Sequence, residues 1–265
     1  MTEPVPQSPE QKSSEPILNI PRIVLATIAV LVGVHLFRMF ALNGAEDERF
    51  VLTLAFIPAR YSTDPAVSGS FPGGFGADLW TFFTYAFLHA DFIHIGLNLA
   101  WLIPFGTAVA RRFGPWRYTV FMLVTAAAGA LAQLVSTPGA SAPMIGASAA
   151  VSGLMAAAMR FIFQPNGPLE TWRGGAGEGE AYRVPAAPLV AVARDMRFLF
   201  FLAVWMGLNA LFGVGVVSFG AEPGQQIAWQ AHIGGFFAGL LLFTAFDPAV
   251  PRARDLGAEP PPEVT

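Results

Sequence analysis

The chain has 265 residues, of which 54% are hydrophobic and only 12% are charged. A soluble domain carries about a quarter charged residues, so this composition, with a mean hydropathy of +0.53, predicts a membrane protein with several spans. The net charge of -3 and the scattering of basic residues over the loops argue against a nucleic-acid-binding protein, and the absence of cysteine excludes disulfides, thiolate metal sites and a cysteine nucleophile.

The two ends of the chain are predicted to be disordered tails. Residues 1–19 are rich in Pro, Ser, Glu and Gln and lack the apolar core of a cleavable signal peptide. Residues 248–265 contain a run of prolines and no apolar periodicity. We therefore expect a single domain over residues 20–247.

Six apolar stretches lie between the tails, each long enough to cross roughly 30 Å of hydrocarbon as a helix. They are residues 20–42, 80–105, 116–135, 147–163, 198–217 and 228–246. The sequence therefore predicts an all-α membrane protein built as a bundle of six transmembrane helices.

Two of the connections between these stretches are long. Residues 43–78 contain several prolines and glycines, which fits either an ordered cap or a flexible lip. Residues 164–197 contain four glycines between positions 174 and 179, which is typical of a solvated linker.

The arginine and lysine residues predict the orientation in the membrane. With six spans, all of them except Arg38, Arg49 and Arg60 fall on the side of the two chain ends. Loops rich in positive charge remain in the cytoplasm, so we expect both termini to be cytoplasmic and the first long connection to lie outside. The excess of Arg over Lys, together with abundant Ala, Gly and Pro, is associated with bacteria of GC-rich genome, so a bacterial inner membrane is the expected location.

Four polar residues suited to hydrolytic chemistry fall within the apolar stretches: His94, Asn98, Ser148 and His232. A charged side chain at the centre of a span costs roughly 2.5–3.5 kcal/mol, so such residues usually face a protein interior or a water-filled cavity. His94 and Asn98 are four residues apart and project from one helix face. Ser148 and His232 each begin a helix that enters from the outer side, so the two side chains should lie at the same depth. The remaining intramembrane histidine, His35, has no such polar partners and is read as structural.

Rows of small residues flank two of these side chains. Such rows allow helix backbones to approach closely, and ordinary packing explains any one of them. Two rows beside two reactive groups predict instead that the fourth and sixth stretches bring Ser148 and His232 to hydrogen-bonding distance. The rows consist of Ala149, Gly153 and Ala157 in the fourth stretch and Ala231, Gly235 and Gly239 in the sixth, the latter widened by Gly234 and Ala238.

In this combination the residues resemble the rhomboid family of intramembrane serine proteases. The resemblance covers residues 80–246 and implies a six-span rhomboid-like bundle with a long first extracytoplasmic loop. It also implies cleavage of the transmembrane segments of membrane proteins near the outer face. The matching motifs are His89-x-x-x-x-His94-x-x-x-Asn98 in the second stretch, Gly146-Ala147-Ser148 at the start of the fourth, and His232-Ile233-Gly234-Gly235 with Ala238-Gly239 in the sixth.

The resemblance implies a role for each of these residues. Ser148 would be the nucleophile and His232 its general base, as a dyad, because the only acidic residue in the six stretches is Asp91, near the mouth of the second. His94 and Asn98 would stabilise the oxyanion. No cofactor and no metal are implied, and the partners would be transmembrane protein substrates and the lipid bilayer, without nucleic acid. The fifth stretch and residues 218–226 would form a mobile gate and cap. Supporting positions are His89, Gly146 and Ser152.

Three features depart from the family pattern or leave alternatives open. The residue after Ser148 is Ala149, where the family has Gly, and a second serine, Ser152, does precede a glycine. We favour Ser148 as the nucleophile because unpaired N–H groups and the positive dipole end of a helix N-terminus stabilise an oxyanion. Trp80 is followed by Thr81, where many members have Arg.

Two other functional classes compete with a protease. Ala149 keeps open a catalytically inactive rhomboid-like membrane chaperone or adaptor, against which the presence of Ser148 and His232 argues. A transporter or channel would usually show two matching halves, and we see no such internal repeat.

Overall fold

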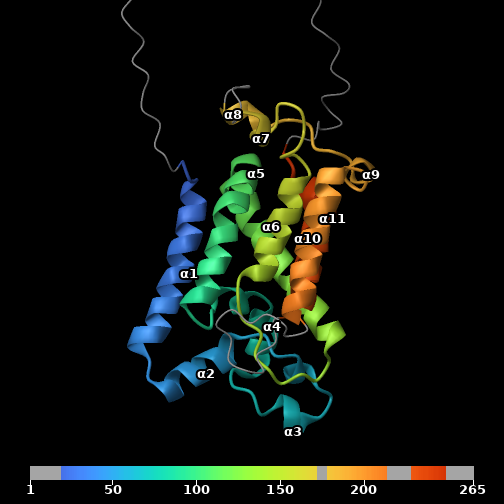
Figure 1. Ribbon diagram of the computed structural model, residues 1–265. Coiled ribbons are helices and arrows are strands. Elements are labelled where there is room, and N and C mark those ends of the chain that lie inside the picture. The colour runs from blue at the N-terminus through green and yellow to red at the C-terminus, as the bar shows by residue number, and fades with distance from the viewer. Residues whose placement is uncertain (1–18, 172–177, 214–227, 249–265) are drawn as a thin grey trace, which may run out of the picture.

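The computed structural model describes residues 19–171, 178–213 and 228–248. Long helices lie side by side as a bundle in this part of the chain (Figure 1). They are α1 (Arg22–Ala41), α5 (Phe92–Ser136), α6 (Ser148–Met159), α10 (Met196–Gly213) and α11 (Trp229–Phe246). By length and composition α1, α5 and α11 could each cross a membrane, while α6 and α10 are shorter apolar helices. The all-α fold class is therefore confirmed for the described residues, and six spans remain a prediction.

Helix α5 is long enough to make two arms of the bundle. Its 45 residues bend at Gly114, whose φ of 76° and ψ of 169° are not helical and which precedes Pro115. A glycine adopts such a φ without strain, and a proline has no N–H to continue the hydrogen-bond ladder. The bend divides α5 into a first arm, residues 92–113, and a second arm, residues 115–136, which match parts of the second and third predicted stretches.

The predicted start of the second stretch, at residue 80, is wrong. Residues 74–87 form two separate short helices, α4 (Gly74–Thr84) and η2 (Tyr85–Phe87), and the chain is extended at Leu88. The first arm of α5 begins only after Asp91, whose side chain accepts a hydrogen bond from the backbone N–H of His94 at 2.7 Å. The run of apolar residues across this break concealed the boundary, which the N-cap residue Asp91 marks.

Helices α6 and α11 pack backbone against backbone. A Cβ atom added at Gly235 would collide with the carbonyl oxygen of Ala149, and one at Gly239 with that of Gly153. The predicted contact between the two small-residue rows is therefore confirmed. Gly234 does not widen the α11 row, because it faces Ala132 and the carbonyl of residue 128 on the second arm of α5.

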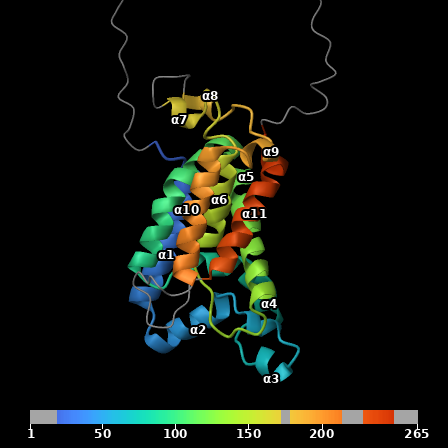
Figure 2. The ribbon, with the colours of Figure 1, turned by 45° about the vertical axis from the view of Figure 1, so that its right-hand side comes forward.

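The segment between α1 and α5 is an ordered cap, one of the two forms that its sequence allowed. It contains α2 (Gly44–Leu54), η1 (Pro58–Tyr61) and α3 (Pro65–Ser68) as well as α4 and η2, and α2, α3 and α4 lie at one end of the bundle (Figure 2). Arg60 holds the cap together by donating to the carbonyls of Leu52 at 2.7 Å and Pro72 at 2.9 Å. The indole of Trp80 donates to the carbonyl of Thr53 at 3.0 Å, which anchors α4 to the end of α2.

The opposite end of the bundle carries α7 (Pro168–Thr171), α8 (Glu178–Ala181) and α9 (Leu189–Val192). The predicted solvated linker is exposed at residues 188–191 but is packed at other points: Val192 is 3% exposed, and the guanidinium of Arg112 binds the carbonyls of Tyr182 and Val184 at 2.9 and 2.8 Å. Arg112 also forms a buried ion pair with Asp247 at 2.8 Å. The buried side chain of Arg112 thus holds this connection against the end of the bundle. Three of its four glycines lie outside the described residues.

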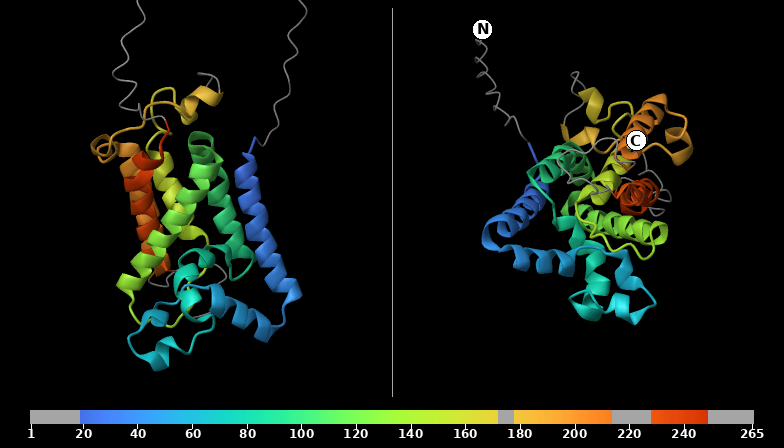
Figure 3. Two further views of the ribbon diagram at one scale, coloured as in Figure 1. Left: turned by 180° about the vertical axis from the view of Figure 1, so that it is seen from behind. Right: turned by 60° about the horizontal axis from the view of Figure 1, so that its bottom comes forward.

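The start of α1 and the end of α11 lie at this same end, away from the ordered cap (Figure 3). This arrangement agrees with the predicted separation of the first long connection from both chain ends. The cytoplasmic placement of the termini remains a prediction.

Candidate active site

The side chains of Ser148 and His232 are in hydrogen-bonding contact. Ser148 is the first residue of α6, and His232 lies in the first turn of α11. The Nε2 atom of His232 lies 2.7 Å from the Oγ atom of Ser148. The close packing of α6 on α11 described above aligns the two helix starts and therefore brings these groups together.

The loop that leads into Ser148 has a conformation that only glycine adopts easily. Gly146 has a φ of 118°, and a Cβ atom at this position would lie 2.7 Å from the Nε2 atom of His94. The N–H of Gly146 donates to the carbonyl of Tyr85 at 3.0 Å. Two further hydrogen bonds, of 3.1 and 2.8 Å, join Met144 to Phe56 of the ordered cap. The position of Ser148 therefore depends on the cap as well as on α6.

His94 presents a hydrogen-bond donor to this loop. Its Nδ1 atom accepts the backbone N–H of Ala90 at 3.3 Å. The neutral ring then carries its hydrogen on Nε2, the atom that faces Gly146 beside Ser148. Asn98 lies one turn further along α5, where its Nδ2 atom donates one hydrogen to the carbonyl of His94 at 2.9 Å and keeps a second hydrogen.

These groups line a common cavity of about 260 Å³. Its wall includes residues 143–145 of the loop between α5 and α6. Among the polar residues in the wall are His94 and Asn98 from α5, Ser148 from α6 and His232 from α11. The structure thus brings together the four residues on which the sequence analysis depended.

Two of the supporting residues act on the backbone around Ser148. His89 is fully buried and lies before α5 rather than inside the second stretch, and its Nε2 atom accepts the N–H of Ala147 at 3.4 Å. Ser152 donates its hydroxyl to the carbonyl of Ser148 at 2.7 Å, one turn deeper in α6. The hydroxyl of Ser152 is thereby bonded to backbone, whereas that of Ser148 faces His232.

Asn209 of α10 also belongs to this site, and the sequence analysis missed it. Its Oδ1 atom lies 2.6 Å from the Nδ1 atom of His232, and its Nδ2 atom donates to the carbonyl of Trp205 at 2.8 Å. A sequence signal existed, because Asn209 is a strongly polar residue within the apolar stretch 198–217. The proposed cap at residues 218–226 lies outside the described residues.

Ala149, the departure from the family motif, has a structural counterpart on α5. Ala149 is 1% exposed. A Cβ atom added at Gly129 would lie only 2.5 Å from the methyl carbon of Ala149. The glycine at position 129 therefore leaves the space that the methyl group fills. Ala149 is accommodated without displacing Ser148.

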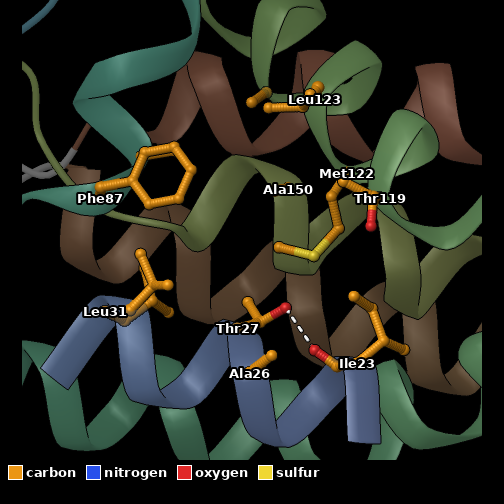
Figure 4. A pocket seen from close by; sticks show the side chains of 12 residues that line it. Ile23, Ala26, Thr27, Leu31, Phe87, Thr119, Met122, Leu123 and Ala150 are labelled. Atoms are coloured by element: carbon orange, nitrogen blue, oxygen red, sulfur yellow. Dashed lines mark hydrogen bonds between the residues drawn. The ribbon is translucent and has the colours of Figure 1, made fainter. Parts of the chain in front are cut away.

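A second pocket, of about 210 Å³, lies between α1 and the second arm of α5 (Figure 4). Its wall is almost wholly apolar, and the hydroxyl of Thr27 in it donates to the carbonyl of Ile23 at 2.9 Å. His35, elsewhere on α1, packs edge-on against Phe92 with ring centroids 4.8 Å apart, in keeping with its structural reading. Neither this apolar pocket nor the surroundings of His35 offers the groups that hydrolysis needs. No group of three or more potential metal ligands occurs among the residues that the structure describes.

Comparison with known proteins gives a consistent result. The family model for the rhomboid domain matches residues 76–247. Rhomboid-related protein 3 of Homo sapiens is 26% identical over 203 residues, which cover 77% of this chain and 44% of the human protein. Its Mus musculus counterpart is 26% identical over 204 residues, with the same coverage. Rhomboid protease GlpG of Enterobacter sp. (strain 638) is 28% identical over 97 residues, 37% of this chain and 30% of that protein. This chain therefore spans less than half the length of these relatives, and the match over most of its bundle shows that it belongs to the rhomboid family.

Proposed function

We propose that this protein is an intramembrane serine endopeptidase that cleaves the transmembrane segments of membrane proteins near the outer face. The observation that carries the proposal is the contact of 2.7 Å between Ser148 Oγ and His232 Nε2 at the wall of a cavity. Membership of the rhomboid family and the similarity to a relative named as a protease support the same class of reaction.

The reaction begins at Ser148. A serine hydroxyl is a weak nucleophile at neutral pH, so it needs an adjacent base to accept its proton as it attacks the scissile carbonyl. His232 accepts this proton on Nε2 and later donates it to the leaving amine. Water then takes the place of the amine and is activated by the same imidazole, which releases the acyl product and restores Ser148.

The oxyanion that forms during the attack needs hydrogen-bond donors. The N–H of Ser148 is in the first turn of α6, where backbone N–H groups have no helical partner. The Nε2–H of His94 and the second amide hydrogen of Asn98 point to the same region from α5. Each donor of this kind contributes about 2.7–4 kcal/mol of transition-state stabilisation.

The membrane determines how the substrate reaches this site. We assign six membrane crossings to α1, the two arms of α5, α6, α10 and α11, with the termini in the cytoplasm and the ordered cap outside. The cavity then lies near the outer surface, where water reaches it without exposing unpaired backbone to lipid. A substrate helix moves in sideways between the bundle helices and unwinds locally, because helical hydrogen bonds shield its peptide bonds.

The inactive chaperone or adaptor is the alternative to this function. Its main support in the sequence is Ala149, and the space beside Gly129 accommodates that methyl group. An adaptor also has no use for a hydroxyl held against an imidazole nitrogen. The protease therefore explains more of the geometry.

A fluorophosphonate probe, combined with a reconstituted substrate, tests the proposal. The wild-type protein in liposomes should react with the probe and cleave a single-span substrate, Ser148→Ala should do neither, and the matched control Ser152→Ala should retain both activities. A wild-type protein that neither reacts nor cleaves a panel of single-span substrates would establish the adaptor instead. Loss of labelling and cleavage in Ser152→Ala, with both retained in Ser148→Ala, would identify Ser152 as the nucleophile instead.

A further inference from the structure

We propose that Asn209 is a positioning residue that holds His232 in the tautomer required of a general base. The catalytic consequence of this inference rests on the proposed function, whereas the hydrogen bonds of Asn209 are independent of it. Asn209 lies on α10, whereas Ser148 and His232 lie on α6 and α11. A third helix therefore contributes to the catalytic site.

The direction of each hydrogen bond follows from the chemistry of the four groups. The carbonyl of Trp205 can only accept, so the amide nitrogen of Asn209 must face it, at 2.8 Å. This fixes the orientation of the amide and leaves its Oδ1 atom toward the Nδ1 atom of His232, at 2.6 Å. Since a carbonyl oxygen donates nothing, His232 must carry its hydrogen on Nδ1.

The consequence appears on the other side of the imidazole ring. A neutral histidine with its hydrogen on Nδ1 has a bare nitrogen at Nε2. This is the atom 2.7 Å from Ser148 Oγ, so the serine hydroxyl donates to it and is ready to lose its proton. In the opposite tautomer Nε2 would hold a hydrogen and could not act as a base.

The surroundings of Asn209 support a fixed role. Asn209 is 6% exposed. One turn before it, Trp205 stacks on Phe236 of α11 with ring centroids 4.5 Å apart and an interplanar angle of 25°. This aromatic contact docks α10 against the same helix that carries His232. A neutral amide also avoids the desolvation cost that a carboxylate would carry in this apolar region.

Because Asn209 belongs to α10, the tautomer of His232 depends on where that helix packs against α11.

Three variants separate this role from general packing. Asn209→Leu keeps the size of the side chain and removes the acceptor, Asn209→Asp keeps an acceptor, and Leu211→Ala removes packing from an exposed position of the same helix. We expect the rate of fluorophosphonate labelling to fall about 10- to 100-fold in Asn209→Leu, less than the ~10⁴-fold loss that follows the removal of a charged triad partner. Leu211→Ala should stay close to the wild type. Asn209→Asp keeps the acceptor for His232 but loses the amide donor to the Trp205 carbonyl and buries a carboxylate, so its labelling rate should fall less than that of Asn209→Leu.

The tautomer itself can be measured without activity. The chain has only four histidines, so protein labelled with ¹⁵N-histidine in micelles gives four ring systems, and His232→Ala identifies the relevant one. Long-range ¹H–¹⁵N spectra should show the hydrogen of His232 on Nδ1 in the wild type and in Asn209→Asp, and a mixture of tautomers in Asn209→Leu. Should Asn209→Leu not fold, as judged by circular dichroism, Asn209→Ala takes its place because it adds no bulk.

Unchanged labelling and an unchanged tautomer in the folded acceptor-free variant would overturn the inference. Failure of the wild type to label would instead count against the proposed protease. In that case the spectra would still show whether Asn209 sets the tautomer, so the two failures are distinguishable.

Discussion

At the scale of single residues, the backbone conformation of the loop before Ser148 determines the geometry of the site as much as the catalytic side chains do. Gly146 combines a φ of 118° with a Cβ direction that His94 occupies. Both constraints are imposed by the loop between α5 and α6, which must present Ser148 to His232 and leave the donor of His94 free.

Replacing Gly146 by Ala should reduce activity more than stability. The strained φ costs about 1–3 kcal/mol. The new methyl group, 2.7 Å from Nε2 of His94, displaces that donor, and loss of one such donor lowers kcat about 10²–10³-fold. Cleavage rates in liposomes and thermal unfolding measure the two effects.

Gly139 provides the matched control. It has a φ of 79° in the same loop, but nothing lies within 4 Å of an added Cβ. Gly139→Ala should therefore show a similar loss of stability with cleavage near the wild-type rate. Equal loss of cleavage in the two variants would show that backbone strain alone disturbs the site.

Individual residues were predictable from sequence where a pattern connected them. The four-residue spacing of His94 and Asn98, and the placement of Ser148 and His232 at helix starts of the same side, indicated a shared site. Asn209 had no neighbour at helical spacing to mark it as functional. Its role depends on which face of α10 meets α11, and such lateral contacts are not encoded in the spacing within one helix.

At the scale of helices, the contact between α6 and α11 sets the geometry of the site. The two small-residue rows predicted this contact correctly, because close approach needs small residues on both partners. The start of the second helix was mispredicted, since hydropathy does not distinguish a short apolar helix such as α4 from the long helix that follows it. The capping side chain of Asp91 was the better guide.

A single methyl group should disturb this contact. Gly239→Ala places a Cβ against the backbone of Gly153, and neither backbone can yield without separating the helices. Overpacking of this kind costs about 1–3 kcal/mol, which a lowered thermal unfolding midpoint would show. Gly33→Ala in α1, where nothing lies within 4 Å, is the control and should leave the midpoint unchanged or raise it. Equal midpoints for the two variants would contradict the close approach of α6 and α11.

At the scale of the whole molecule, buried arginines stabilise both ends of the bundle. At the cap end Arg38 of α1 pairs with Asp47 of α2 at 2.7 Å, and two backbone hydrogen bonds join Phe56 to Met144. The other end is held by the buried pair Arg112 and Asp247, whose side chains are 1% and 3% exposed. The sequence did not predict this pair, because its members are separated by 135 positions and meet only when α5 and α11 are packed.

Removing one partner of this pair should destabilise the whole bundle. Asp247→Ala leaves a buried guanidinium without its counter-charge, which typically costs about 3–5 kcal/mol. Thermal unfolding in detergent measures the loss. Asp195→Ala is the control, because its ion pair with Arg197 is in contact with solvent, with side chains 21% and 57% exposed, and such surface pairs contribute about 0–1 kcal/mol. A small effect in both variants would mean that the carbonyls of residues 182 and 184 suffice for Arg112.

The separation of Ser148 and His232 by 84 positions has a consequence for biosynthesis. Under the proposed protease function, a nascent chain that carries Ser148 but not yet His232 has no base for its serine. Such a chain gains hydrolytic power only after residue 232 has been synthesised.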